Sequence, residues 1–404
     1  MANNNKHTGP NVPALRFPEF SGEWEQHSLS DYLRFKNGLN PDAKRFGKGI
    51  KFISVMDILN NASISYDCVR ASVAATEQEI SDFEVEYGDV LFQRSSETLE
   101  DIGRSNIYVD SRHCVFGGFV IRGKKIGEYE PYFMKYRLDS PYARKSIIVK
   151  GAGAQHFNIG QDGLSKVELF FPKYEEQVKI GDLLRIIDDR INTQSKIIED
   201  KETLYKAIID KHFKEIRKND AIQEVYLSNV FKERVEYSSN DGVFPHASLT
   251  KEGVSIKTDR YNRDFLVKDT DKQYKVTRIN DICYNPANLK FGVITRNKVG
   301  TLIFSPIYVT FEVRNGYDPA YIELMVTNSD FINKMLRFQE GTVYERMAVS
   351  SEDFLSESCK IPDLEIQTEF SAHVSKIEQS IQVEKKYLES IRRIKNYILE
   401  AMFI

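Results

Sequence analysis

Residues 175–213 read EEQVKIGDLLRIIDDRINTQSKIIEDKETLYKAIIDKHF, and residues 365–403 read EIQTEFSAHVSKIEQSIQVEKKYLESIRRIKNYILEAMF. The two stretches align without a gap at an offset of 190, so that Gln177 falls on Gln367 and Phe213 falls on Phe403. Self-similarity at a fixed offset indicates one structural unit built more than once. The sequence therefore predicts an internal duplication, and with it a pseudo-two-fold symmetry.

Both stretches carry apolar side chains at the a and d positions of a heptad repeat, the spacing of helices that pack against other helices. The predicted seam consists of Ile180, Leu184, Ile187, Ile191, Ile198 and Ile208 in the first stretch and Phe370, Val374, Ile377, Ile381, Leu388, Ile391 and Ile398 in the second. Polar residues interrupt the same registers at Gln194, Lys201, Glu384 and Lys395. We expect two long helices that pair antiparallel; the alternative, in which each packs on its own globular module, remains open.

The remainder of the chain reads as two globular modules. We expect a flexible tail over residues 1–14, a module over 15–171, a helix over 172–217, a second module over 218–361 and a second helix over 362–404. Each helix has roughly 40 residues and would be ~60 Å long.

The modules are expected to be mixed α/β. Short runs rich in β-forming residues occur at 90–92, 115–121, 167–171, 281–284, 293–294, 303–311 and 360–361. Helical pieces are expected at 131–138 and 319–337. The order of the strands in the sheets does not follow from the sequence.

The composition is that of a folded protein, with 41% hydrophobic residues among 404. No apolar run approaches the ~20 residues that span a bilayer, and the polar N-terminus has no secretory signal pattern. Cys68, Cys114, Cys283 and Cys359 are scattered, so neither a disulfide framework nor a zinc site is expected. These features predict a cytoplasmic protein. The net charge of −3 predicts that a partner helps in any binding of nucleic acid.

Motifs of nucleic-acid enzymes are absent from the sequence. The nearest string to an N-P-P-aromatic loop is Asn285-Pro286-Ala287-Asn288, which lacks the second proline and the aromatic residue. Gly151-Ala152-Gly153-Ala154 lacks the third glycine of a nucleotide-binding loop. Glu199-Asp200-Lys201 lies in the middle of a predicted helix, where a solvated face is the better interpretation than a nuclease site. We expect a chain that is not an enzyme and holds no metal.

Several local motifs resemble those of the specificity subunits of Type I restriction-modification systems. They are VPALRFPEF at 12–20 followed by Gly22-Glu23-Trp24, GDVLFQRS at 88–95, the Y-N-P of 284–286 with Ser305-Pro306-Ile307-Tyr308, and Pro172 with Glu175, Glu176 and Gln177. The resemblance covers essentially the whole chain.

The resemblance implies a division of labour. Each module would be a target recognition domain for one DNA half-site, and the helix pair would be a spacer that fixes a non-specific gap. The chain would recruit two DNA methyltransferase (modification) subunits for adenine methylation, and restriction/translocase subunits for ATP-dependent cleavage. S-adenosylmethionine, ATP and Mg would bind to those partners, and this chain would hold no cofactor.

Candidate DNA contacts are basic and amide side chains in glycine- and serine-rich loops, because such groups bind phosphates and base edges. In the first module they are Lys44, Arg45, Lys48, Gln93, Arg94, Ser95, Ser96, Thr98, Gln155 and His156. In the second they are Tyr284, Asn285, Asn288, Lys290, Arg296, Tyr344 and Arg346. An ordinary surface loop is the alternative for each single residue.

Two other functions stay open on the sequence alone. One is a coiled-coil scaffold with two protein-binding modules, which the acidic balance favours slightly. The other is a fused methyltransferase and nuclease, against which the missing catalytic motifs argue.

Overall fold

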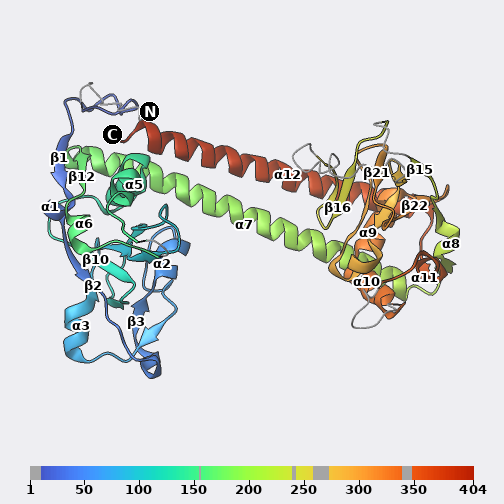
Figure 1. The fold of residues 1–404 in the computed structure, drawn as a ribbon, viewed down its shortest axis with the longest axis horizontal. Helices are drawn as coiled ribbons and strands as arrows, with labels where there is room; N and C mark the ends of the chain where they lie inside the picture. Colours follow the sequence, from blue (N-terminus) through green and yellow to red (C-terminus); the bar gives the residue numbers. More distant parts are fainter. Residues whose placement is uncertain (1–10, 154–155, 239–242, 258–272, 339–347) are drawn as a thin grey trace. The chain divides into compact units, whose positions relative to one another are not determined.

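The computed structural model describes residues 11–153, 156–238, 243–257, 273–338 and 348–404. The chain divides into two compact units. Unit 1 comprises Met1–Lys196 and Lys386–Ile404, and unit 2 comprises Ile197–Lys385. Each unit contains a segment of both long helices, α7 (Tyr174–Lys218) and α12 (Leu364–Ala401), besides its own strands and short helices (Figure 1).

The two long helices run antiparallel inside each unit (Figure 1). In unit 1, Nζ of Lys395 lies 2.6 Å from Oδ1 of Asp188. In unit 2, Nζ of Lys201 lies 2.7 Å from Oε1 of Glu384. Three of the polar residues that interrupt the heptad register therefore form ion pairs between the helices, which compensates their position at the seam.

Every predicted seam residue is buried or half-buried. The two helices pack on each other and also on the globular modules, so both of the packing arrangements considered from the sequence occur. Ile180 from α7 and Ile398 from α12 belong to the core of unit 1, whereas Phe213 from α7 and Val374 from α12 belong to the core of unit 2. Each long helix thus begins in one core and ends in the other.

Unit 1 is a mixed α/β unit. Its strands are β1 (Glu25–Ser28), β2 (Leu33–Asn37), β3 (Phe46–Ile53), β4 (Ser72–Val73), β5 (Glu84–Val85), β6 (Val90–Gln93), β7 (Ser95–Ser96), β8 (Ser105–Ile107), β9 (Cys114–Phe116), β10 (Val120–Lys125), β11 (Phe157–Asn158) and β12 (Glu168–Phe171). Its short helices are α1 (Leu29–Tyr32), η1 (Ala43–Arg45), α2 (Val55–Asn60), α3 (Glu77–Phe83), α4 (Pro131–Asp139), α5 (Pro141–Ile148) and α6 (Gln161–Ser165). The main sheet has the antiparallel order β2-β10-β6-β8, and a second sheet has the order β4-β3-β9-β5.

Unit 2 is built in the same way. Its strands are β13 (Glu224–Tyr226), β14 (Phe231–Glu233), β15 (Tyr237–Ser238), β16 (Ala247–Thr250), β17 (Gly253–Ile256), β18 (Tyr274–Thr277), β19 (Ile282–Tyr284), β20 (Ile294–Arg296), β21 (Leu302–Phe304), β22 (Val309–Val313) and β23 (Ser358–Lys360). Its short helices are α8 (Leu227–Val230), η4 (Pro286–Phe291), α9 (Pro319–Thr327), α10 (Ser329–Met335), η5 (Leu336–Phe338) and α11 (Ser351–Ser356). Its main sheet has the antiparallel order β14-β22-β19-β20.

The main sheets of the two units have the same topology. In each, the strands follow one another across the sheet as first, fourth, second and third along the chain. A two-stranded sheet beside the start of a long helix also occurs in both units, as β1-β12 before α7 and β13-β23 before α12. The mixed α/β architecture with two long helices agrees with the expectation from the sequence.

Three expected elements are divided in the structure. The run at 115–121 is β9 and β10 with a turn between them, and the run at 303–311 is β21 and β22 with a turn between them. Two consecutive glycines (Gly117 and Gly118) interrupt the first run and Pro306 interrupts the second, and both residue types favour turns over strands. The helix expected at 319–337 is α9 and α10, because Asn328 ends the first and its side chain accepts a hydrogen bond from the Asp330 amide at 3.0 Å.

Candidate nucleic-acid interface

The first group of predicted contacts in unit 1 lies where the central strand β6 ends. Gln93 is buried, and its Nε2 donates to the Ser95 carbonyl oxygen at 2.9 Å, so it shapes the loop from inside. The Arg94 side chain is half-buried, and its Nη1 donates to the Gly118 carbonyl oxygen at 3.3 Å. Among the described residues no carboxylate pairs with Arg94, so its charge is available to a phosphate or a base edge.

The short strand β7 joins two predicted segments that are far apart in the sequence. It pairs with β11, so that Ser96 lies opposite Phe157 and Ser95 opposite Asn158. The hydroxyl of Ser95 donates to Oδ1 of Asn158 at 2.5 Å. His156 is exposed at the start of this pairing and therefore lies beside the serines. Gln155 lies outside the described residues.

Thr98 closes the loop after β7 by a local hydrogen bond. Its hydroxyl donates to Oδ2 of Asp101 at 2.8 Å. This bond and the nearby Arg104 guanidinium lower the pKa of Asp101. Thr98 is thus occupied within the loop, and its hydroxyl is a weaker candidate for DNA than Arg94.

The basic segment around η1 is a second exposed group. Lys44 and Lys48 are exposed, as phosphate contacts require. Arg45 instead holds Glu79, with Nη1 at 3.0 Å from Oε1, and donates Nε to the Ala74 carbonyl oxygen at 2.8 Å. The Arg45 hydrogen bonds lower the pKa of Glu79 to about 2. Because Arg45 is paired with Glu79, it anchors this segment, and its charge is not free to bind a phosphate.

In unit 2, Tyr284 is a core residue. Its side chain is fully buried, its ring stacks on Phe354 at a centroid distance of 5.0 Å, and its hydroxyl donates to the Val349 carbonyl oxygen at 3.1 Å. This placement argues against a direct contact between Tyr284 and DNA. Its neighbours Ile282 and Cys283 are equally buried, and this apolar run was the signal in the sequence for a core position.

The loop that follows β19 is a capped 3-10 helix, η4. Asn285 is buried and accepts a hydrogen bond from the Ala287 amide at 3.1 Å, so it acts as the cap. Asn288 is half-buried and Lys290 is exposed, with its Nζ 5.0 Å from the centroid of the Phe291 ring. These two remain available for contacts.

Arg296 lies on β20 and is held by other residues. Its Nε lies 3.1 Å from Oε2 of Glu323, and its Nη1 donates to Oδ1 of Asn280 at 2.9 Å. Glu323 neutralises much of its charge. Tyr344 and Arg346, the other candidates in this unit, lie outside the described residues.

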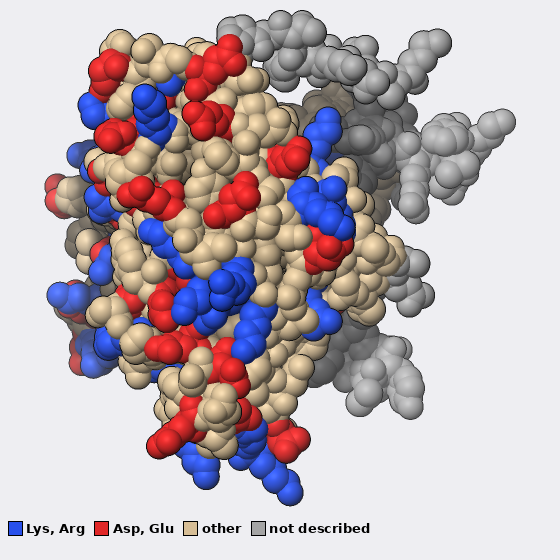
Figure 2. All heavy atoms as spheres, turned by 90° about the vertical axis from the view of Figure 1, so that its left-hand side faces the viewer, with Lys and Arg blue, Asp and Glu red and all other residues tan. Residues whose placement is uncertain are grey.

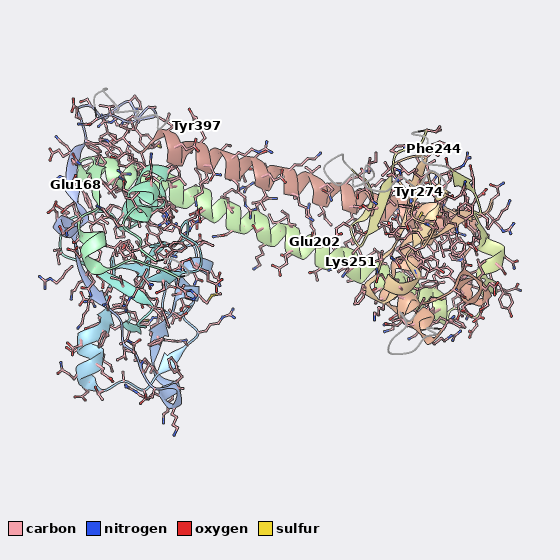
Figure 3. All side chains as sticks on the ribbon, viewed as in Figure 1. Glu168, Glu202, Phe244, Lys251, Tyr274 and Tyr397 are labelled. Carbon is pink, nitrogen blue, oxygen red and sulfur yellow. The ribbon has the colours of Figure 1, made fainter. Side chains whose placement is uncertain are left out.

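A cavity of about 760 Å³ in unit 2 opens beside Lys290. Lys251, which lies on the turn between β16 and β17 (Figure 3), lines the same cavity, as does Lys298. Lys298 pairs with Glu323 at 3.0 Å, whereas Lys251 has no ion pair among the described residues. Lys251 was not among the predicted contacts, because no sequence motif links a lone lysine in a hairpin to a loop some 40 residues away.

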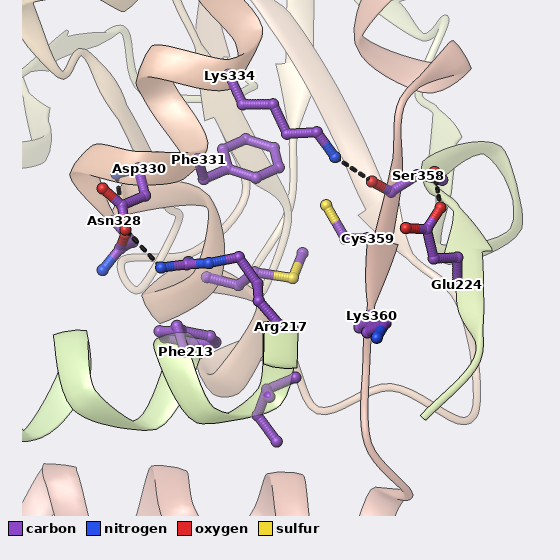
Figure 4. Close-up of a pocket in the computed structure, with 12 residues that line it drawn as sticks. Phe213, Arg217, Glu224, Asn328, Asp330, Phe331, Lys334, Ser358, Cys359 and Lys360 are labelled. Atoms are coloured by element: carbon purple, nitrogen blue, oxygen red, sulfur yellow. Dashed lines mark hydrogen bonds and ion pairs between the residues drawn. The ribbon is translucent and has the colours of Figure 1, made fainter. Parts of the chain in front are cut away.

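A smaller cavity of about 250 Å³ lies in unit 2 at the end of α7 (Figure 4). Phe213, Phe331 and Cys359 form part of its apolar lining. Its cations are paired within the chain: Nζ of Lys334 lies 2.7 Å from Oε1 of Glu357, and Arg217 pairs with Asp330. Internal pairing leaves this cavity without a free charge for a phosphate.

Charge is mixed over the face of unit 1 that Figure 2 shows, where lysine and arginine are interspersed with aspartate and glutamate. Among the described residues, no group of three or more His, Cys, Asp or Glu side chains is arranged to hold a metal ion. No helix in the described part of the chain is long and apolar enough to cross a membrane.

Comparison with known proteins identifies a family domain in the first part of the chain. Residues 21–200 match the family described as "Type I restriction modification DNA specificity domain". The whole chain aligns with a Methanocaldococcus jannaschii protein named as a type I restriction enzyme MjaX specificity subunit, at 22% identity over 427 residues, covering 97% of this chain and 95% of that protein. Residues 21–200 therefore form a Type I restriction modification DNA specificity domain, and the chain as a whole is similar to a specificity subunit.

Solved structures share the fold of this chain. The crystal structure of the Type I restriction-modification S subunit from M. genitalium superposes with a TM-score of 0.57 at 14% identity, over 97% of this chain and 99% of that one. A chain from a study of complex assembly and conformational transition of the type I system gives a TM-score of 0.57 at 11% identity, over 93% and 96%. At these identities the likeness concerns the fold.

The matched domain is a DNA specificity domain, and the chain is a DNA-recognition protein rather than a catalyst. The alternatives of a protein-binding scaffold and of a fused methyltransferase and nuclease are therefore set aside. The loops at the ends of β6 and β19 are the candidate positions for that recognition.

Proposed function

We propose that this chain reads a bipartite DNA target, with one half-site bound by each unit and a non-specific gap between them. The observation that supports the proposal most is the matched topology of the main sheets, β2-β10-β6-β8 and β14-β22-β19-β20. Two copies of one sheet in a single chain offer two equivalent reading surfaces. A two-part target matches that duplication, as half-sites match the subunits of a dimeric repressor.

The two long helices are proposed as the spacer that fixes the gap. With 45 and 38 residues, α7 and α12 would measure ~68 and ~57 Å at 1.5 Å per residue. Each of them takes part in both cores, so a change in helix length would alter the distance between the reading surfaces. The gap in the DNA target is expected to change with it.

The reactions are assigned to partner subunits. We propose that the chain directs adenine methylation by two methyltransferase subunits and ATP-dependent cleavage by restriction/translocase subunits. S-adenosylmethionine, ATP and Mg would bind to those partners. The complex would act in the cytoplasm, where its DNA substrates lie.

The test is a genome-wide map of methylated adenines in a host that carries the whole system, with and without this chain. The expected result is the loss of one gapped, two-part motif when the chain is deleted. A deletion of seven residues (about two helical turns) from the facing positions of both long helices should shorten the gap and leave both half-sites unchanged. A methylome that does not respond to deletion of the chain would overturn the proposal.

A further inference from the structure

A four-residue turn in unit 1 presents an exposed aromatic side chain. The turn Gly117–Val120 connects β9 to β10 and is closed by a hydrogen bond from the Val120 amide to the Gly117 carbonyl oxygen at 2.8 Å. Phe119, the third residue of the turn, is 70% exposed. No other large hydrophobic side chain among the described residues is more exposed. One exposed apolar residue is ordinary by itself, so its surroundings decide what it means.

The backbone of this turn is packed tightly against the unit. The Gly117 amide donates to the Ile53 carbonyl oxygen at 3.0 Å. A Cβ atom placed on Gly38 would lie 2.1 Å from the Gly117 carbonyl oxygen, which shows how closely the two backbones approach. Phe119 is therefore held outward by a fixed turn and is not part of a loose loop.

The same turn is bonded to the candidate contact Arg94. The Arg94 amide donates to the Phe119 carbonyl oxygen at 2.9 Å, and Nη1 of Arg94 donates to the Gly118 carbonyl oxygen at 3.3 Å. A surface that brings the Arg94 guanidinium to DNA would bring the Phe119 ring there as well.

Unit 2 has a turn at the corresponding place in its main sheet, with different residues. The turn Ser305–Tyr308 leads into β22 and is closed by a hydrogen bond from the Tyr308 amide to the Ser305 carbonyl oxygen at 3.2 Å. Its third residue, Ile307, is 59% exposed. The strand β22 pairs with β19 just as β10 pairs with β6. Each turn thus lies beside the end of the strand that leads into the candidate contact loop.

We propose that Phe119 and Ile307 are the apolar base contacts of the two units, each packing against the 5-methyl group of a thymine in the major groove. The inference rests on the proposed function, because it needs one half-site per unit. Arginine reads guanine in the major groove, where the thymine methyl group is also exposed. In unit 1, an arginine and an apolar side chain on segments joined by hydrogen bonds suit that groove together.

DNA fits this surface better than a protein partner does. A stable protein interface needs an extended surface of about 800 Å² on each partner. Here a single apolar side chain stands beside Arg94 and the serines of β7, which are groups that bind phosphates and base edges.

The test uses the full chain in its complex with the methyltransferase subunits. Phe119→Ala should make one thymine position degenerate in one half-site of the methylated motif, and Ile307→Ala should do the same in the other half-site. With duplexes in which deoxyuridine replaces that thymine, the parent complex should bind on the order of fourfold more weakly, the contribution of one methyl group. The Phe119→Ala complex should bind both duplexes equally. Phe119→Leu, which keeps an apolar side chain, should retain the preference for thymine.

Ile126→Ala is the matched control, because Ile126 is 50% exposed and follows the opposite end of β10. It should leave the motif unchanged, and thermal unfolding should be alike for all variants. A parent motif that persists unaltered in both Phe119→Ala and Ile307→Ala overturns this inference and leaves the proposed function intact. Equal loss of methylation at all sites, with loss of the copurified methyltransferase, assigns the turns to a protein contact and also overturns it. Absence of any gapped motif with the parent chain removes both proposals.

Discussion

In both units, a glutamine in the first turn of a long helix joins that helix to the rest of the unit by hydrogen bonds. In unit 1, Nε2 of Gln177 donates to the Pro172 carbonyl oxygen at 3.0 Å, and its Oε1 accepts from the Glu130 amide at 3.1 Å. In unit 2, Gln367 bonds to Pro362 and to the Asp318 amide at 2.7 and 2.9 Å. Glu130 and Asp318 are themselves the caps of α4 and α9.

The loops beyond the central strands differ between the units. After β6, strand β7 pairs with β11 and Arg94 has no carboxylate partner among the described residues. After β19, a capped 3-10 helix follows, and Glu323 holds Arg296. The comparison teaches that the residues joining helix to module are shared by the two units, whereas the candidate reading residues differ. Two units that differ in this way are suited to two different half-sites.

The largest expected difference concerns a buried carboxylate before each central strand. Oδ2 of Asp281 lies 2.8 Å from Nε of Arg234, whereas Oδ2 of Asp89 lies 3.8 Å from Nε of Arg122. Asp281→Ala should destabilise unit 2 by about 3–5 kcal/mol, because the Arg234 guanidinium loses two charge-assisted hydrogen bonds and keeps only the partly exposed Glu236 and Glu312 as partners. Asp89→Ala should destabilise unit 1 by about 1–3 kcal/mol, mainly through two backbone amides that lose an acceptor. Hydrogen-exchange protection of β19 and β6 measures both, and equal losses would contradict the difference.

Replacing the glutamine that the two units share should instead destabilise both units equally. Gln177→Ala and Gln367→Ala each leave a backbone amide and a proline carbonyl oxygen without a partner. Each should lower the local stability of its own unit by about 2–4 kcal/mol. Hydrogen exchange at the first turns of α7 and α12 is the measurement, and the exposed Gln382→Ala on α12 is the control. A loss in one unit alone would break the equivalence of the two junctions.

Substitutions of Arg94 and Lys290 should distinguish recognition of bases from binding to the phosphate backbone. Arg94→Ala should weaken binding to targets with the unit 1 half-site by about 1–3 kcal/mol and relax one position of that half-site. Lys290→Ala should weaken binding to all sequences alike and lower the salt dependence by about one phosphate contact. Binding titrations at several salt concentrations, with each half-site scrambled in turn, distinguish the two. An equal loss on all sequences with Arg94→Ala would reassign it to the phosphate backbone.

The smallest effect is a dependence on pH just below 6.5, which His212 should give to the paired helices in unit 2 and not to those in unit 1. His212 stacks on Phe370 at a centroid distance of 3.6 Å, and burial lowers its pKa below 6.5. The unfolded chain therefore takes up the proton first, so the stability of unit 2 is complete above pH 6.5 and declines as the pH falls through that value. The equivalent residue in unit 1 is Met402, which does not titrate. His212→Met should remove the decline in hydrogen-exchange protection of α7 residues near 213, and a decline that persists would assign it to other groups.

The long helices and the fold class follow from the sequence, because a heptad pattern and an ungapped repeat depend on local spacing alone. The strand order does not follow, since pairs such as β2 with β10 join residues some 90 positions apart. Residue Gly181 illustrates the limit. A Cβ atom there would lie 2.3 Å from Oε2 of Glu130, a contact made by a distant helix cap, and the repeat places Ser371 at the matching position in unit 2.

The candidate contacts were predictable only in part, for the same reason. The residue types and the loop at 93–98 follow from motifs. The apolar run before Tyr284 signals the burial of that residue, whereas the ion pair that holds Arg45 joins it to Glu79, 34 positions away, and is not visible in local sequence. Phe119 and Ile307 were missed because each lies within a run that reads as one continuous strand. Glycines at 117–118 and Pro306 were the available signal for the two turns.

The passage of each helix through both cores has a consequence for synthesis on the ribosome. The ring of Trp24 packs 6.3 Å from that of Phe403, so the core of unit 1 contains residues made nearly 380 positions apart. At 5–20 residues per second, the earliest part of that core waits about 20–80 s for its last side chains. The unit that begins first is therefore completed last, and its apolar face needs protection from aggregation during translation.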